Sequence, residues 1–277
     1  MAVDKKLQKS LDRLGKAVAT RQEARVIQLP LWPEPKRGTP NSFIRSSLFA
    51  AIQGKDRGFI KGQLLASQNN IEVKFTGEQL NQDDLTLWET LVHLARHEPL
   101  GDHCLFTAHG ILKAMNLHTG GDEHKRLEEG IVRLTACAVQ ITHDGRTYGG
   151  NLVHSYRSES SESLYDVRLN KDLINLFGES HWTAINWEQR LKLRRKPLAQ
   201  ALHAYFSSHR DPYPIGLEFL RDVTGSQNTE LRDFKRRVKN ALGELVQIGF
   251  LVGFSINGGL VAVERSRLAV SSQPERG

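Results

Sequence analysis

The sequence contains little cysteine. Cys104 and Cys137 are its only two cysteines in 277 residues, and they stand far apart without a CxxC motif. Neither a disulfide framework nor a structural zinc site is indicated, so we expect two buried thiols. Long apolar runs are also missing: none approaches the roughly 20 residues of a membrane-spanning helix, and the start MAVDKKLQKS lacks the apolar centre of a secretory signal. We therefore expect a cytoplasmic protein with no membrane partner.

The marks of DNA-handling enzymes are missing as well. There is no GxxxxGK(S/T) phosphate-binding loop, so we expect no ATP hydrolysis. None of the eleven histidines stands two residues from another, which removes the His-x-His metal pair of rolling-circle nicking proteins. His93 and His97 are four residues apart, but Leu94 stands where a zinc protease carries its catalytic glutamate. We expect a non-enzymatic binding protein with no catalytic residues, no metal and no cofactor.

What the chain does have is positive charge. Its 38 Lys and Arg against 31 Asp and Glu give a net charge of +7, and the pI is near 9.5. Phosphates release counterions when they meet such side chains, so a polyanion is the natural partner. Because many basic proteins bind no specific polyanion, the distribution of charge along the chain has to show whether a polyanion-binding surface exists.

A pattern of two helices followed by a hairpin occurs twice. A helix through residues 111–115 and a second from about residue 122 precede an alternating segment, 139–142, which turns at HDGR and returns through TYGGNLVHSY. Later, a helix at 217–220 and a long helix at 229–245 precede GFLVGF, the turn SINGG and LVAVER. The basic helical stretch NWEQRLKLRRKPLAQALHAYFSSHR supplies the first helix of this second unit. Each unit is typical of a winged helix.

The fold class predicted is therefore α+β, with two tandem winged-helix domains and an extended N-terminal segment. Other patterns predict a helix at 41–52, a strand at 71–75 and a helix through GEQLNQDDLTLWETLVHLARH, with Asn81 as its cap. The expected division is residues 1–40 for a basic amphipathic segment and proline-rich linker, 41–178 and 179–268 for the first and second winged-helix domains, and 269–277 for a disordered tail.

The helix at 229–245 is the main candidate for reading DNA. With its apolar stripe turned to the core, the opposite face carries Thr229, Arg232, Asp233, Arg236 and Asn240, and Lys239 flanks them. Arginine can read guanine and asparagine can read adenine from the major groove. We add the basic run Arg194, Arg195 and Lys196 as phosphate contacts. The alternative is a basic face that is merely solvated.

The equivalent helix of the first unit is more acidic. Glu128 and Glu129 face outward beside Lys125, and carboxylates pointed at phosphates weaken binding. We expect a lighter DNA contact here, or a contact with protein. The cations available for it are Lys125, Arg126, Arg133 and Arg146.

Several long segments resemble the TrfA family of plasmid replication initiators. They are LPLWPEPKRGTPNSFIRSSLFAAIQGKDR, VKFTGEQLNQDDLTLWETLVHLAR, IVRLTACAVQITH and WEQRLKLRRKPLAQALHAYFSSH, and the likeness runs from about residue 28 to about residue 265. The resemblance implies a non-enzymatic bacterial protein that binds double-stranded iteron repeats at a plasmid origin and helps to open AT-rich DNA, with single-stranded origin DNA as a further candidate ligand. It also implies host DnaA, the DnaB helicase and the sliding clamp as partners, and a homodimer as the inactive form.

The segment VIQLPLWPEP admits two interpretations. Gln28, Leu29, Leu31 and Trp32 resemble the Gln-Leu-x-Leu-Phe peptides that dock on the bacterial sliding clamp, and an extended segment stiffened by proline suits docking. Alternatively, Leu29, Leu31 and Trp32 fold back as an edge strand or a plug against the first winged-helix domain. Residues 1–24 are equally open, because their helical apolar spacing fits either a helix for a partner or a frayed tail.

Two other functions remain compatible with the sequence. A winged-helix transcriptional repressor would also bind repeated operator sites, but it needs neither a helicase nor a clamp. A protein-interaction adaptor with a solvated basic face would show no steep salt dependence of its DNA affinity.

Overall fold

The computed structural model describes residues 29–266, apart from residues 54–56, 69, 99–101, 144, 160–163 and 178–180 and the side chains of residues 146, 174 and 175. Helices and strands alternate along this part of the chain, so the fold is mixed α and β, as predicted. None of the described helices is long and apolar enough to cross a membrane.

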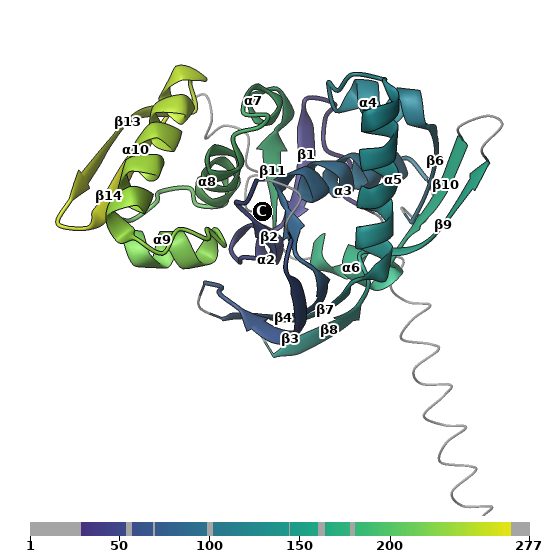
Figure 1. Ribbon diagram of the computed structural model, residues 1–277, viewed down its shortest axis with the longest axis horizontal. Coiled ribbons are helices and arrows are strands. Elements are labelled where there is room, and N and C mark those ends of the chain that lie inside the picture. Colours follow the sequence, from purple (N-terminus) through teal and green to yellow (C-terminus); the bar gives the residue numbers. More distant parts are fainter. Residues whose placement is uncertain are drawn as a thin grey trace, which may run out of the picture.

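Buried apolar side chains gather into two clusters. One runs from Leu29 to Ile185 and includes Ala204, and the other runs from Leu193 to Val261. We call elements β1 to β11 the first unit and α8 to β14 the second unit, with α7 (Trp187–Lys192) joining them. Figure 1 shows the second unit on the left and the first on the right, with α7 between them and α8 on the side of the second unit that faces the first.

The first unit contains most of the strands. Its elements in chain order are β1 (Lys36–Pro40), α2 (Asn41–Ile44), β2 (Phe49–Ala50), β3 (Phe59–Leu65), β4 (Ile71–Glu78), β5 (Leu80–Asn81), α3 (Gln82–Ala95), β6 (His103–Thr107), α4 (Ala108–Ala114), α5 (Gly121–Ala136), β7 (Ala138–His143), β8 (Arg146–Gly150), β9 (Val153–Glu159), β10 (Leu164–Leu169), α6 (Lys171–Ile174), the 3₁₀ turn η1 (Asn175–Phe177) and β11 (Trp182–Asn186). The larger sheets have the antiparallel orders β3-β4-β7-β8 and β6-β10-β9, and β1 pairs with β11.

The helix α3 lies at the centre of the first unit. Asn81 caps it by accepting from the backbone N–H groups of Asp83 and Asp84, and the Asp84 carboxylate accepts from the Asn81 backbone N–H in return. This capping box satisfies donors that a helix start leaves unpaired. The predicted cap and the predicted apolar stripe are both confirmed, because Leu85, Trp88, Val92 and Ala95 are all buried.

Two local predictions in the first unit are wrong. The helix expected at 41–52 stops after the short α2, because the Ser47 N–H donates to Ala66 O at 2.8 Å and the Arg45 carbonyl accepts from Gln68. These backbone partners lie across the fold and replace helical ones. The hairpin expected to return as far as residue 156 also divides, since β8 ends at Gly150 and β9 joins the other sheet.

The second unit has the predicted order of helices followed by a hairpin. Its elements are α8 (Pro197–Ser207), β12 (Ile215–Gly216), α9 (Leu217–Val223), α10 (Leu231–Gln247), β13 (Leu251–Asn257) and β14 (Leu260–Arg265). The basic stretch before it divides into α7 and α8 at a turn, and Pro197 opens α8 at a position where its missing N–H costs nothing. The helix α10 begins two residues later than predicted, so Thr229 lies ahead of it and not on its face.

Candidate nucleic-acid interface

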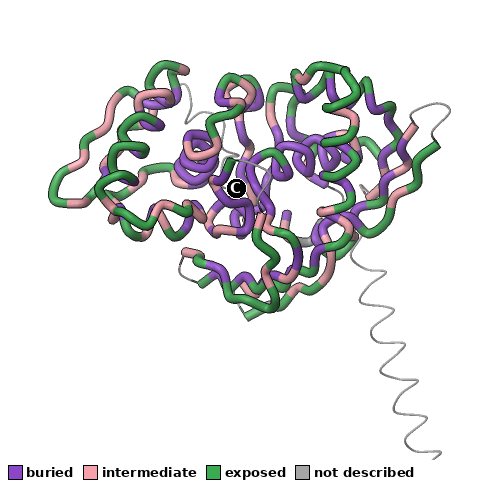
Figure 2. The backbone as a smooth tube through the Cα atoms, viewed as in Figure 1, coloured by how far each residue is buried: buried purple, intermediate pink, exposed green. Residues whose placement is uncertain are grey.

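The helix α10 has one buried face and one basic face. Phe234, Val238, Leu242 and Leu245 are each fully buried in the second cluster. Figure 2 shows exposed, green turns along this helix, which lies beside the β13–β14 hairpin. The predicted contacts on the basic face are exposed, namely Arg232, Arg236, Lys239 and Asn240. The packing fixes the helix while leaving this face to solvent.

Two further cations on α10 escaped the sequence prediction. Lys235 and Arg237 are exposed on either flank of the predicted face. The same helical wheel could have found them, because both stand outside the apolar stripe. The acidic side chains on the helix are Asp233, 3.5 Å from Arg236, and Glu244. The exposed side of α10 is therefore strongly basic.

The turn between α7 and α8 carries the other predicted phosphate contacts. Arg194 donates to the Asn116 carbonyl in the turn between α4 and α5. Arg195 has a φ of 63°, an uncommon left-handed conformation for arginine, and its carbonyl accepts from Gln53 Nε2 at 2.6 Å. Lys196 forms an ion pair with Glu244 of α10. This turn connects the two units, and the Arg195 side chain is exposed on it.

The helix α5 keeps fewer of its predicted contacts. Lys125 and Arg126 are at its exposed start, and Arg126 pairs with Glu123 at 2.9 Å. Arg133 instead donates to Asp84 at 2.9 Å, with its side chain only 14% exposed. This guanidinium holds α5 against α3, and no local pattern indicates the pairing because the two residues stand 49 positions apart. Arg146 begins β8, and its side chain lies outside the described part of the chain.

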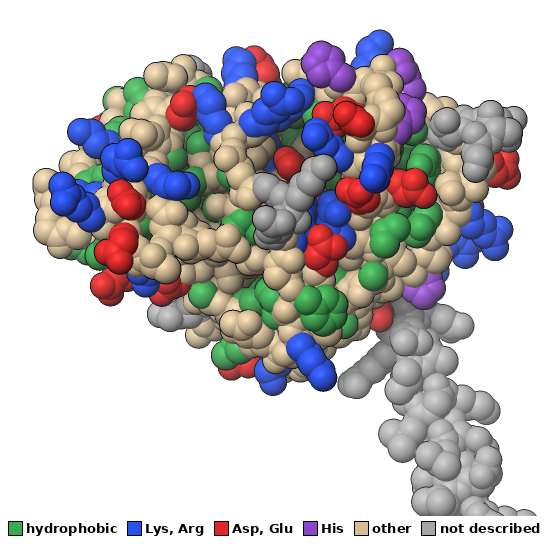
Figure 3. Space-filling model, in the orientation of Figure 1, with side chains coloured by type: hydrophobic (Ala, Val, Ile, Leu, Met, Phe, Trp, Pro, Cys, Tyr) green, Lys and Arg blue, Asp and Glu red, His purple; other side chains and the backbone are tan. Residues whose placement is uncertain are grey.

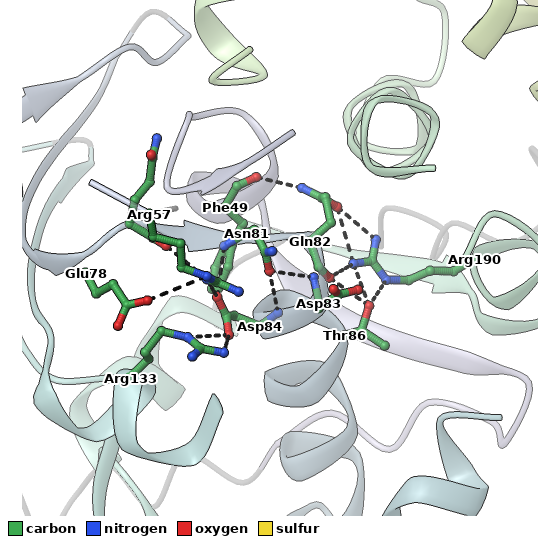
Figure 4. Close-up of polar contacts among 11 residues, drawn as sticks. Phe49, Arg57, Glu78, Asn81, Gln82, Asp83, Asp84, Thr86, Arg133 and Arg190 are labelled. Atoms are coloured by element: carbon green, nitrogen blue, oxygen red, sulfur yellow. Dashed lines mark hydrogen bonds and ion pairs between the residues drawn. The ribbon is translucent and has the colours of Figure 1, made fainter. Parts of the chain in front are cut away.

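Figure 4 shows Arg133 and Arg57 converging on Asp84 from opposite sides. The Asp84 side chain is only 1% exposed, so its charge depends on these two partners. In the same view, Arg190 from α7 reaches Gln82 and Thr86 of α3, and it also pairs with Glu89 at 2.8 Å. This buried contact holds the joining helix to the first unit.

A cleft of about 1020 Å³ separates α5 and the start of α3 from the α7–α8 turn. Its lining mixes charges of both signs with apolar side chains, among them Lys125, Glu128, Glu129, Leu191, Arg194 and Arg195. The outward face of α5 thus lines a cleft that it shares with the α7–α8 turn, and Glu128 and Glu129 on it are exposed. Figure 3 shows Lys and Arg gathered over α10 and near α7, whereas carboxylates mix with them near α5. On this face of the molecule, the basic surface is therefore strongest on the second unit.

Residues 3–265 match the family model described as TrfA protein. The chain belongs to the TrfA family. A relative in this family, the plasmid replication initiator protein TrfA of Escherichia coli, is 30% identical over 259 residues, which cover 89% of this chain and 67% of the relative.

Solved structures resemble this TrfA-family chain in fold. A crystal structure of domains 2 and 3 of RctB has a TM-score of 0.55 at 14% identity, covering 82% of this chain and 98% of that one. The Pi initiator protein in complex with iteron DNA has a TM-score of 0.46 at 14% identity, covering 64% of this chain and 88% of that one. At 14% identity, the RctB similarity shows a shared fold and nothing about shared ligands.

The segment before β1 folds back on the first unit of this TrfA-family chain. Leu29 is 1% exposed and Trp32 is 4% exposed, whereas Leu31 is 68% exposed. The Trp32 ring lies 5.8 Å from the Phe177 ring and 5.7 Å from the Trp182 ring, centroid to centroid, and its Nε1 donates to His93 Nδ1 at 2.9 Å. The burial of Leu29 and Trp32 agrees with the interpretation that these side chains fold back on the first unit as a plug. Gln28 lies outside the described residues.

The two predicted buried thiols agree with the structure. Cys104 and Cys137 are free and buried, and burial raises the pKa of their thiols to about 12 and about 11. Of the two histidines spaced four apart, His93 is buried, and desolvation lowers its pKa to about 4, whereas His97 is exposed. Within the described ranges, no group of three or more His, Cys, Asp or Glu side chains is arranged to hold a metal ion.

Proposed function

We propose that this chain initiates plasmid replication by binding directly repeated DNA sites, the iterons, with α10 in the major groove. The observation that carries this proposal is the exposed row of Arg232, Arg236 and Asn240 on a helix whose other face is fully buried, in a member of the TrfA family. Rigid backing matters because a side chain that reads a base edge must be held in register. We propose no catalytic step.

We further propose that each set of two helices and a hairpin is a winged-helix domain. The two apolar clusters support this division, since α4 and α5 belong to the first and α9 and α10 to the second. The boundary we propose lies at α7 and not at residue 178, because β11 pairs with β1 and Ile185 belongs to the first cluster. Two domains in one polypeptide can contact successive grooves without two-fold symmetry, so we expect one monomer on each repeat.

The two domains should contribute unequally to DNA binding. The α7–α8 turn and the start of α5 place Arg195 and Lys125 on the border of the same cleft. We propose that these two cations contact phosphates, which position the protein on DNA without specifying sequence. Arg133 is left out of the proposed contact surface because its guanidinium pairs with Asp84.

The proposed partners are those of the family: host DnaA, the DnaB helicase and the sliding clamp, with a homodimer as the inactive form. For the clamp, the burial of Leu29 and Trp32 argues against docking through the side chains of the QLPLW segment. A clamp contact at this segment would require Trp32 to leave the core.

The test of base reading compares specific and random DNA. Arg232→Ala and Arg236→Ala should each weaken iteron binding by about 1–3 kcal/mol if the side chain is bidentate to a base, with a much smaller effect on random DNA. Arg157→Ala is the matched control, because Arg157 is an exposed arginine on β9, far from α10 in Figure 1. Equal losses on both DNAs for the α10 variants would refute base reading.

An initiator and a repressor differ in their effect on the bound duplex. The initiator predicts permanganate-reactive thymines beside the protected repeats, because unpaired thymines appear where the duplex opens. A repressor protects its sites without such reactivity. Protection with no reactive thymines, in the presence of the host initiation proteins, would favour the repressor.

A further inference from the structure

Two long helices of the chain each contain an interior glycine. Glycine in a helix interior lowers stability relative to alanine, so each needs a reason. For Gly130 in α5 the reason is packing, because a Cβ there would lie 2.8 Å from Leu87 Cδ2 of α3. For Gly243 in α10, the described residues place no such neighbour within 4 Å of the Cβ position. Nothing in the described fold therefore requires glycine at residue 243.

The position of Gly243 on the helix supplies a reason. Residues Arg232, Arg236, Asn240 and Gly243 follow one another at spacings of four, four and three, which keeps them on one face of an α-helix. At 3.6 residues per turn, Gly243 lies between the directions of Arg232 and Arg236. The bare backbone at Gly243 is thus on the centre line of the face proposed to meet DNA.

The dimensions of the groove indicate what would approach Gly243. At about 1.5 Å per residue, Gly243 lies about 18 Å along the axis from Leu231 at the start of α10. The major groove is only about 12 Å wide, and a recognition helix contacts bases mainly with its N-terminal residues. With its N-terminal residues on the bases, α10 leaves the groove toward its C-terminal end, and the part of the DNA that Gly243 can meet is the sugar–phosphate backbone at the wall of the groove.

We propose that Gly243 is the point of closest approach between α10 and the DNA backbone, and that its lack of a side chain sets the depth to which the helix enters the groove. This inference rests on the proposed function, because it takes the face of Arg232 and Arg236 to be the DNA-binding face. Gly243 is a positioning residue: it contributes no charge and no hydrogen bond from a side chain.

The test is a size series at residue 243 in the full chain. Gly243→Ala should raise the Tm by a few degrees, since alanine favours the helix and meets no neighbour. The same substitution should weaken binding to a DNA duplex about fivefold or more, and Gly243→Leu should weaken it further, because a Cβ and longer groups hold the helix away from the backbone. The loss should be similar on iteron and random duplexes, since backbone contacts carry no sequence information.

Gly130→Ala is the matched control: its Cβ would lie 2.8 Å from Leu87 Cδ2, so the gain in Tm expected for Gly243→Ala should be smaller or absent there. Unchanged or tighter DNA binding by Gly243→Ala and Gly243→Leu, with the Tm raised as expected, would overturn the inference while leaving the proposed function standing. If Arg236→Ala also binds both DNAs like wild type, the proposed function itself fails. A lower Tm for Gly243→Ala would overturn the inference in a different way, by showing that the fold needs glycine there.

Discussion

Replacing Trp32 with alanine should destabilise the first unit. The indole is 4% exposed and packs against the rings of Phe177 and Trp182, which also contact each other. It also lies so close to Gly38 of β1 that a Cβ on this glycine would be 2.5 Å from the indole. The substitution would leave a cavity between two segments that stand far apart in the sequence, residues 32–38 and residues 177–182, and the surrounding side chains cannot all collapse into it.

The expected loss of unfolding free energy is about 3–5 kcal/mol, the usual cost of truncating a buried tryptophan. Part of this loss is the hydrogen bond from Trp32 Nε1 to His93 Nδ1, which measures 2.9 Å. Trp32→Phe keeps one aromatic ring but removes the fused second ring with its N–H donor, so it should lose about 1–3 kcal/mol, because part of the packing is lost and the buried His93 nitrogen would be left unpaired. Leu31→Ala is the control on the neighbouring residue: Leu31 is 68% exposed, and its truncation should cost about 0.5 kcal/mol or less.

Urea unfolding followed by far-ultraviolet circular dichroism measures these differences without relying on tryptophan fluorescence. The two units can unfold separately, so each transition should be fitted on its own. Equal stability of wild type and Trp32→Ala, together with loss of clamp binding by the variant, would refute the plug and restore the docking interpretation. A large loss of stability with clamp binding intact is the result that the packing predicts.

Three further predictions concern buried and paired charges. Arg190→Ala should lower the free energy of unfolding in urea by about 3–5 kcal/mol, because Glu89 would be left charged and buried without the partner that now lies 2.8 Å away. A small decrease would contradict the role of this ion pair in joining α7 to the first unit. Glu244→Gln should free Lys196 from its ion pair so that it can contact a DNA phosphate. DNA binding should tighten, and the plot of log K against log salt should become steeper by up to about one unit. An unchanged slope would show that Lys196 does not contact DNA. Burial lowers the pKa of His93 to about 4 and the pKa of His203 to about 3, below the ordinary 6.5. As the pH drops from about 6.5 toward 4, the unfolded chain therefore takes up protons before the folded chain does, and the free energy of unfolding should fall. Greater stability at pH 5 than at pH 7 would contradict this.

The elements that local pattern specifies were predictable from the sequence. The helix α3 is indicated by Asn81 and Asp84 at the capping-box spacing and by an apolar stripe, and α10 is indicated by its own stripe with arginines opposite. Both helices are long, and their signals repeat over several turns. The exposed cations of α10 follow from the same periodicity.

Features that depend on distant partners were not predictable. The segment after α2 has a helical pattern, but its backbone bonds to Ala66 and Gln68, so tertiary pairing overrides local preference. Whether Trp32 is exposed depends on rings at 177 and 182, and the role of Arg133 depends on Asp84. A surface cation and a cation in a buried ion pair look alike until the fold brings the carboxylate to one of them.

Hydroxyl-radical footprinting of the origin on the plasmid that encodes this protein is the sharpest test of α10 as the helix that reads iterons. We expect protection of evenly spaced direct repeats, all in one orientation, and loss of that protection in the double variant Arg232→Ala, Arg236→Ala, while Arg157→Ala protects like wild type. Protection of a DNA region that contains no repeated sequence would contradict the assignment of α10 to this role. So would protection that persists after both α10 arginines are replaced.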